Sequence, residues 1–348
     1  MLEVDVTDPV EMPRKRWRFP SELGTFLALI GVYVLFLALC AMKGERAFTA
    51  FRSLGNLKGI MTHTVIVGVG ALGMTFVIIS GNIDLSAGSI VALVTCVTGY
   101  ALHHWGGEAP GVLFPMVAAC LGMLAGMLAG MLNGFLVGVL GLVSFIATLG
   151  MMQMARGAAS LIGKNQTIVT PDNWLQKLMY IEPARIDPSL RWLVFAPGVW
   201  LLLFLLICVH VLLRYTVFGR YVYAVGSNED TARLCGVNVA RVKILVFALS
   251  GFLLGVAGVM LYASLAVGDP TSAVGMELDI IAAVVIGGAS LSGGKGSAIG
   301  AIFGALIMSV LRNGSTMMSW DNAIQNIMVG FVIVGASYLD RLKERRQY

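Results

Sequence analysis

Residues 215–243 read YTVFGRYVYAVGSNEDTARLCGVNVARVK and form a polar island between two long apolar runs, residues 192–213 and 244–265. Each run is long enough to cross the hydrocarbon core of a bilayer at about 1.5 Å per residue. The island must therefore lie at a membrane face. This stretch decides the fold, because it indicates a chain that enters the membrane on both sides of a short polar connection.

Charge places the island on the cytoplasmic side. From Arg214 to Lys243 the basic residues outnumber the acidic ones, with Arg214, Arg220, Arg233, Arg241 and Lys243 against Glu229 and Asp230. Short loops with this bias stay in the cytoplasm. Asn228 can cap a short helix whose first turn would carry Glu229 and Asp230. A small helix tied to two spans is suited to pass movement into the membrane, although a plain solvated connection is the alternative.

The composition of the whole chain supports a membrane protein. Apolar residues make up 57% of the 348 residues and charged residues only 12%, too little polar surface to coat a soluble globule. At roughly 20 residues per span, this length supplies about ten spans and leaves no room for a soluble catalytic domain. We therefore predict an all-α integral membrane protein with about ten transmembrane helices. We interpret the net charge of +5 as a signal of which segments face the cytoplasm, and we expect membrane lipid as a partner. We expect no nucleic-acid binding.

The predicted spans define the domain organisation. They lie at residues 23–42, 60–80, 87–104, 111–138, 143–163, 192–213, 244–265, 277–290, 296–312 and 322–339. This pattern gives a cytoplasmic N-terminal segment at 1–22, a transmembrane domain at 23–339 with a cytoplasmic loop at 214–243, and a cytoplasmic tail at 340–348. The basic N-terminal cluster and tail agree with that topology, whereas the outer loop at 43–58 is basic against the rule.

Glycine is distributed in two informative ways. In the fourth span it recurs at positions 122, 126, 130, 134 and 138, a stripe that lets a neighbouring helix approach closely. In addition, VIISGNIDLSAGS from Val77 is echoed by VVIGGASLSGGKGS from Val284. Six predicted helices separate these two glycine- and serine-rich breaks, so both face the cytoplasm. Paired breaks often mark a transport pathway, but a chance match is equally open in a glycine-rich chain.

Two apparent nucleotide motifs fail on their context. GVGALG at 68–73 matches GxGxxG but lies inside an apolar span, without the required strand. ASLSGGKG at 289–296 has Ala289 at the first P-loop glycine and Gly296 where Ser or Thr would bind magnesium. The histidines and cysteines lack ligand spacing. We therefore expect no catalytic site, cofactor site or metal site, and any ATP must be hydrolysed by a separate subunit.

A few polar residues interrupt the apolar spans. A charge between apolar segments is costly and marks a functional hypothesis. The candidates for a translocation pathway or helix break are Asp84, Ser86, Asn133, Gln153 and Arg156. Asp84 and Arg156 are expected either to pair with each other or to satisfy the backbone of broken helices separately. Their opposite signs leave no net field to select an ion, which favours a neutral, hydroxyl-rich solute.

Several blocks of this sequence carry a family resemblance. They are IDLSAGS at 83–89, FIATLG at 145–150 followed by Ala155-Arg156-Gly157, the island at 226–243, and VIGG at 285–288 followed by SGG at 292–294. In this order they resemble the membrane permease of bacterial ABC monosaccharide importers, the ribose and xylose class, over residues 54–339. FVIIS at 76–80 and Asn313-Gly314 lean towards the xylose permeases, whereas Asn82 and Ala87 depart from the usual pattern.

The resemblance implies an assembly in the bacterial inner membrane. Two permease copies would form a homodimer with a pathway near their interface, served by a cytoplasmic ABC ATPase and an extracytoplasmic sugar-binding protein that sets most of the specificity. The island would be the coupling helix. The residues expected to contact the ATPase are Asn228, Glu229, Asp230, Arg233 and Gly236.

Other functions remain open on the sequence. Related ABC permeases carry hexoses, nucleosides or branched-chain amino acids. An ion-coupled secondary transporter would use Asp84 and Arg156 as a relay and would need no soluble partner. A membrane-embedded enzyme would need a nucleophile or a metal cluster, and the sequence supplies neither pattern.

Overall fold

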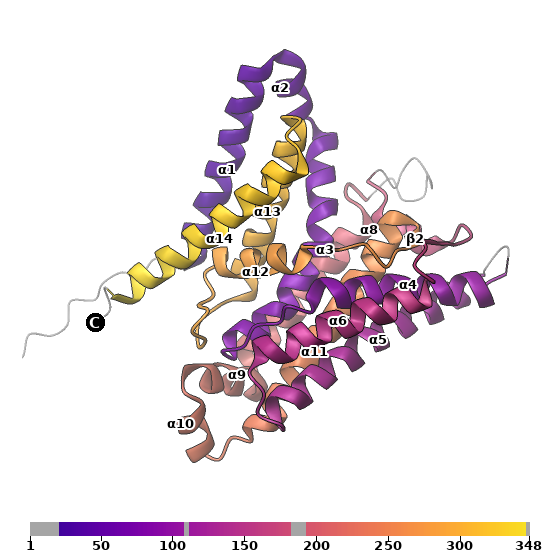
Figure 1. The fold of residues 1–348 in the computed structure, drawn as a ribbon. Helices are drawn as coiled ribbons and strands as arrows, with labels where there is room; N and C mark the ends of the chain where they lie inside the picture. The colour runs from indigo at the N-terminus through magenta and orange to yellow at the C-terminus, as the bar shows by residue number, and fades with distance from the viewer. Residues whose placement is uncertain (1–20, 108–110, 182–192, 346–348) are drawn as a thin grey trace, which may run out of the picture.

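The computed structural model describes residues 21–107, 111–181 and 193–345, and it forms a helix at each of the ten expected membrane positions (Figure 1). These helices are α1 Ser21–Lys43, α3 Leu54–Ile79, α4 Ala87–Trp105, α5 Leu113–Gly138, α6 Ser144–Ile162, α8 Pro197–Tyr215, α11 Val239–Leu265, α12 Met276–Ile286, α13 Ala298–Met317 and α14 Asn322–Arg345. Within the described ranges, 8 of them are long and apolar enough to span a membrane, and α14 adds a shorter apolar stretch, Asn322–Gly335. The basic cluster Arg14, Lys15, Arg16 and Arg18 lies outside the described residues.

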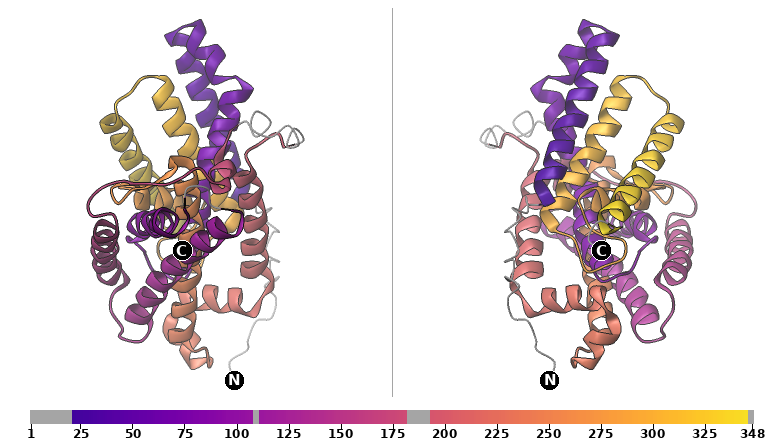
Figure 2. Two further views of the ribbon diagram at one scale, coloured as in Figure 1. Left: turned by 90° about the vertical axis from the view of Figure 1, so that its right-hand side faces the viewer. Right: turned by 90° about the vertical axis from the view of Figure 1, so that its left-hand side faces the viewer.

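Shorter elements connect the spans. They are α2 Glu45–Phe51, η1 Trp174–Met179, α9 Val217–Ser227 and α10 Glu229–Leu234. In addition, β1 Ile168–Val169 pairs antiparallel with β2 Val267–Gly268, so that Ile168 lies opposite Gly268. This pairing ties the segment after α6 to the chain that leaves α11. Figure 2 shows α9 and α10 projecting at one end of the bundle and α1 and α2 at the other.

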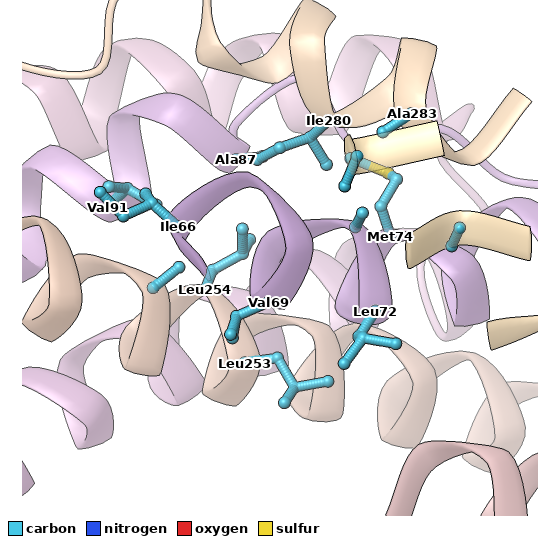
Figure 3. Close-up of a cluster of buried hydrophobic side chains, with 14 of the residues drawn as sticks. Ile66, Val69, Leu72, Met74, Ala87, Val91, Leu253, Leu254, Ile280 and Ala283 are labelled. Carbon is cyan, nitrogen blue, oxygen red and sulfur yellow. The ribbon is translucent and has the colours of Figure 1, made fainter. Parts of the chain in front are cut away.

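Helix α3 occupies the centre of the bundle. Its apolar stretch is 89% buried by the protein itself, against 17% for α1 and 33% for α5, so most of those two helices is left exposed by the described chain. Figure 3 shows the packing around α3, where its residues Ile66, Val69, Leu72 and Met74 meet Ala87 and Val91 of α4, Leu253 and Leu254 of α11, and Ile280 and Ala283 of α12. A central helix in contact with three others transmits any displacement to all of them.

The glycine stripe of α5 packs directly on the backbone of α11, as predicted. A Cβ atom at Gly126 would lie 2.7 Å from the carbonyl oxygen of Gly251, and one at Gly134 would lie 2.6 Å from the Cα of Ile244. Both distances are below van der Waals contact, so any larger side chain would force the helices apart. The two helices therefore form one tightly apposed pair.

Helix α12 is shorter than the predicted span at 277–290. It contains 11 residues and ends at Ile286. At 1.5 Å per residue it rises about 16 Å, roughly half of the hydrocarbon core. Gly288 follows with φ +93°, a left-handed conformation that glycine adopts without strain and that ends the helix. The chain therefore contains a half-helix followed by a glycine- and serine-rich break.

Candidate functional site

The island at 215–243 contains the predicted capped helix. The side-chain oxygen of Asn228 accepts a hydrogen bond of 2.8 Å from the backbone N–H of Thr231, which caps α10. The carboxylate of Glu229 lies between two cations, with Arg233 Nη2 at 3.1 Å on the same helix and Lys243 Nζ at 2.7 Å on α11. Lys243 is largely buried, so its contact with Glu229 fixes α10 to the first turn of α11.

The outward face of α10 combines charge with one apolar side chain. Asp230, Arg233 and Gly236 are all exposed, and Leu234 is 88% exposed. A large exposed apolar residue on a short charged helix is typical of a protein contact. The sequence reasoning missed Leu234. The helical spacing could have indicated it, because Leu234 lies two positions beyond Ala232, which the helix buries.

The two glycine- and serine-rich breaks meet at the end of α9. The N–H of Gly294 donates a 2.8 Å hydrogen bond to the carbonyl oxygen of Ile79, and a Cβ atom at Gly226 would overlap that same oxygen. The hydroxyl of Tyr223 donates to the carbonyl oxygen of Gly296 at 2.8 Å. Burial raises the pKa of the Tyr223 phenol, so it stays protonated and remains a donor. We call residues 79–82, 226–227 and 293–296 the glycine junction.

The glycine junction depends on backbone conformations that other residues disfavour. Gly81, Gly293 and Gly294 have φ values of +77°, +87° and +71°. A Cβ atom at Gly293 would lie 2.9 Å from the Cα of Gly81. The breaks that echo each other in sequence therefore lie side by side in space, at the end of the bundle that carries the island, as the predicted topology requires.

Three of the five predicted pathway residues come together beside the first break. Asp84 is fully buried, and its Oδ1 accepts hydrogen bonds from the backbone N–H of Ser86 at 2.8 Å and from the Ser86 hydroxyl. Asn133 of α5 donates from Nδ2 to the Ser86 oxygen at 2.9 Å. Among the described residues, Asp84 Oδ2 and Asn133 Oδ1 have no hydrogen-bond partner. Ser86 thus links the carboxylate in the break to α5.

Arg156 does not join this cluster, and its predicted pairing with Asp84 is wrong. Its Nη1 donates to the carbonyl oxygens of Pro270 and Ser272, each at 2.8 Å. The Asp84 loop reaches the start of α6, where the N–H of Ile83 lies 3.3 Å from the Ser144 hydroxyl. Arg156 is more than three turns further along that helix, roughly 18 Å away. It instead donates hydrogen bonds to carbonyl groups of the irregular backbone before α12. This is the second of the two roles that the sequence left open for Arg156.

Gln153 lies apart from the other candidates, and a second charged pair was missed. The Gln153 side chain is exposed on α6. Asp279 of α12 and Arg312 of α13 form a two-pronged ion pair, with Nε to Oδ2 and Nη2 to Oδ1 both at 2.8 Å. Asp279 is 5% exposed. The reasoning that Asp84 and Arg156 are the intramembrane charges was therefore incomplete, although the added pair is also neutral in sum.

Comparison with known proteins identifies the family. Residues 56–337 match the family model described as "Branched-chain amino acid transport system / permease component". The chain is 37% identical to the Probable ABC transporter permease protein YphD of Escherichia coli (strain K12), over 94% of this chain and 92% of that protein.

Two further relatives have similar coverage. The Ribose import permease protein RbsC of Escherichia coli (strain K12) is 35% identical over 91% of this chain and 94% of its own length. The Xylose transport system permease protein XylH of the same strain is 33% identical over 90% of this chain and 93% of its own length. No solved structure matches the chain. The chain therefore belongs to the family of ABC transporter permease components, transport subunits that are not themselves catalytic, and is a multi-pass protein of the inner membrane.

Proposed function

We propose that this chain is the permease subunit of an ATP-driven importer that passes a pentose, ribose or xylose, delivered by an extracytoplasmic binding protein. The observation that carries this proposal is the similarity to permeases of ribose and xylose over more than nine-tenths of their lengths. The ion pair beside α12 supports an uncharged cargo, because the Asp279 carboxylate and the Arg312 guanidinium already neutralise each other.

The ATPase docks on α10 in this proposal. The contact residues are Asn228, Glu229, Asp230, Arg233 and Gly236, with Leu234 as the apolar anchor. This assignment is supported by the exposure of Leu234 and by the fixed position of the helix, since the Glu229–Lys243 ion pair holds α10 on α11. A rigid helix with an exposed apolar residue loses little conformational entropy when it binds.

Movement of α10 reaches the membrane by two routes in this proposal. One is the Glu229–Lys243 contact to α11. The other is α9, whose end packs on the glycine junction and so touches both helix breaks.

Two copies of the permease form the pathway in this proposal, with Asp84, Ser86 and Asn133 beside the first break.

A branched-chain amino acid is the second candidate cargo. The description of the matching family model favours it. Such a cargo carries an ammonium and a carboxylate, each of which would need a counter-charge, and Asp279 and Arg312 are already engaged with each other.

Reconstitution tests the proposal directly. Permease, cognate ATPase and binding protein are placed in proteoliposomes, and uptake of labelled ribose, xylose, leucine and a nucleoside is measured with ATP and with a non-hydrolysable analogue. We expect accumulation of a pentose that requires hydrolysable ATP. Accumulation of leucine or the nucleoside instead would overturn the sugar assignment, and pentose uptake without the ATPase would overturn the ABC mechanism.

A further inference from the structure

A cavity of about 460 Å³ lies between α3, α12, α13 and α14. Its volume is within the ~300–1,000 Å³ range of small-molecule sites. Its polar lining residues are His63, Asp279, Ser309, Arg312, Asn313, Thr316 and Gln325. None of these belongs to the pathway candidates read from the sequence.

The half-helix α12 begins at this cavity. Met276, its first residue, lines the cavity together with Ala273 and Val274 of the preceding segment. Helix α12 runs beside α13, because a Cβ atom at Gly304 would meet the backbone of Ala283. The start of α12 therefore lies more than one turn before the outer end of α13. Discontinuous helices whose ends lie inside the membrane are a common construction of transport sites.

The Asp279–Arg312 pair offers hydrogen bonds without a net charge. The carboxylate engages the Nε and Nη2 groups of the guanidinium, and no described residue accepts from Nη1. A hydroxyl group can accept from Nη1 or donate to a free lone pair of the carboxylate while the ion pair stays intact. A ligand carboxylate at Nη1 would add a negative charge to a pair that is already neutral, whereas a hydroxyl group adds none.

Asn313 supplies an acceptor that is still unused. Its Nδ2 donates to Asn56 Oδ1 at 2.9 Å, and the orientation of Asn56 is fixed because its own Nδ2 donates to the carbonyl oxygen of Phe51 at 2.9 Å. Asn313 must therefore present its Oδ1 elsewhere. That oxygen is buried and has no partner among the described residues. Asn313 also lines the cavity, so a ligand that reaches this oxygen and donates a hydrogen bond would satisfy it.

Apolar side chains complete the lining. Ile66 and Val67 of α3, Leu261 of α11 and Met308 of α13 all face the cavity. A sugar ring has C–H groups on its faces and hydroxyl groups at its edge, so it fits a site in which apolar walls surround a few polar groups.

We propose that this cavity is a direct contact site for a neutral, polyhydroxylated solute of pentose size, with Asp279, Arg312 and Asn313 as its hydrogen-bonding groups. The inference rests on the proposed function, because it names where the cargo touches the permease. It adds that the permease itself recognises the cargo, in addition to any selection by the binding protein.

Cysteine protection tests this site in the full complex. Thr316, an exposed residue of the lining, is replaced as Thr316→Cys in a variant whose native cysteines are substituted, and its labelling by a small thiol reagent is timed. We expect ribose or xylose to slow labelling at least threefold and leucine to leave it unchanged. Val169→Cys, on the exposed outer strand β1, is the control for general effects of sugar on the reagent. An unchanged rate with both pentoses, or protection by leucine, overturns the proposal.

A matched pair of substitutions separates recognition from packing. Asn313→Leu and Asn56→Leu both delete the hydrogen bond between the two amides, but only Asn313 lines the cavity. In the Thr316→Cys background, we expect Asn313→Leu to abolish protection by pentose and Asn56→Leu to retain it within twofold. Equal behaviour of the two variants overturns the role of Asn313. Asn313→Ala is the second variant should the leucine variant fail to fold.

The outcome is distinguishable from failure of the proposed function. Pentose transport by the unsubstituted complex, combined with no pentose protection at position 316, leaves the function standing and removes the site. Leucine transport with leucine protection removes both the pentose function and the polyol site.

Discussion

The backbone N–H of Gly294 donates a 2.8 Å hydrogen bond to the carbonyl oxygen of Ile79. The two residues belong to breaks that are more than two hundred positions apart in the sequence. That carbonyl ends α3, the central helix, and it also packs so closely against Gly226 at the end of α9 that a Cβ atom there would overlap it. The island, the centre of the bundle and the second break therefore meet at one oxygen atom.

A substitution at Gly226 tests the glycine junction. Gly226→Ala would place a methyl group on the Ile79 carbonyl oxygen, and backbone cannot retreat as a flexible side chain can. We expect a loss of about 1–3 kcal/mol of stability and at least a tenfold loss of transport per folded molecule. Thermal unfolding of the purified permease and uptake in proteoliposomes measure the two effects. Gly150→Ala on α6, where a Cβ atom meets nothing within 4 Å, is the matched control and should change neither.

Charged substitutions on α10 test whether its exposed face contacts the ATPase. Leu234→Asp replaces an 88% exposed apolar side chain, so the permease should fold normally and fail to copurify with its ATPase. Exchange of Glu229 and Arg233 keeps their i,i+4 ion pair but removes the carboxylate from Lys243, and should also detach or uncouple the ATPase. Val169→Asp on the outer strand is the control. Normal copurification and normal transport of both α10 variants would contradict the coupling assignment.

Asp84 is expected to have a structural role. Its Oδ1 holds the backbone of Ser86, and Asp84→Asn keeps an oxygen that can accept the same hydrogen bonds. We expect a stability loss of about 1 kcal/mol, while transport per folded molecule remains measurable. Asp84→Ala leaves the Ser86 donors unsatisfied and should cost about 1–3 kcal/mol. Sugar-dependent proton uptake by the purified protein, lost in Asp84→Asn, would instead establish a proton relay.

The buried ion pair predicts a rescue experiment. Arg312→Ala leaves the buried Asp279 carboxylate without its counter-charge and should destabilise the fold by about 3–5 kcal/mol. The double variant Asp279→Leu/Arg312→Met replaces both charges with apolar side chains and should recover most of the melting temperature. The same double variant should lose pentose protection at position 316. A single variant that melts like the unsubstituted protein would show that the pair is solvated.

Local chemistry in the sequence was sufficient to locate the helices and the cap. Apolar runs of about 20 residues identify spans regardless of their partners, because the bilayer acts on each run separately. The cap at Asn228 depends on residues within one turn, and the glycine stripe through Gly126 and Gly134 is visible within a single helix, so both were predictable, whereas the identity of the partner helix α11 was not.

Long-range pairing was beyond the reach of the sequence. The sequence left open whether Arg156 pairs with Asp84 or satisfies broken backbone, and its partners are the carbonyl groups of residues 270 and 272, whose irregular backbone no apolar pattern reveals. Asp279 and Arg312 were hidden inside runs that read as continuous spans, and the early end of α12 depends on the left-handed conformation at Gly288.

The close contact between the glycines of α5 and the backbone of α11 should make the two helices move as one rigid unit. At the glycine positions the two backbones are in direct contact, so we expect a displacement applied at Lys243 to move both helices together. At the far end, the Tyr262 hydroxyl is hydrogen-bonded to Thr170 at 2.6 Å and to Asn173 at 3.1 Å. We therefore expect a movement of α10 on the cytoplasmic side to displace the segment that contains Thr170 and Asn173 on the opposite membrane face. In this mechanism α11 transmits the movement as a rigid helix, without a separate hinge.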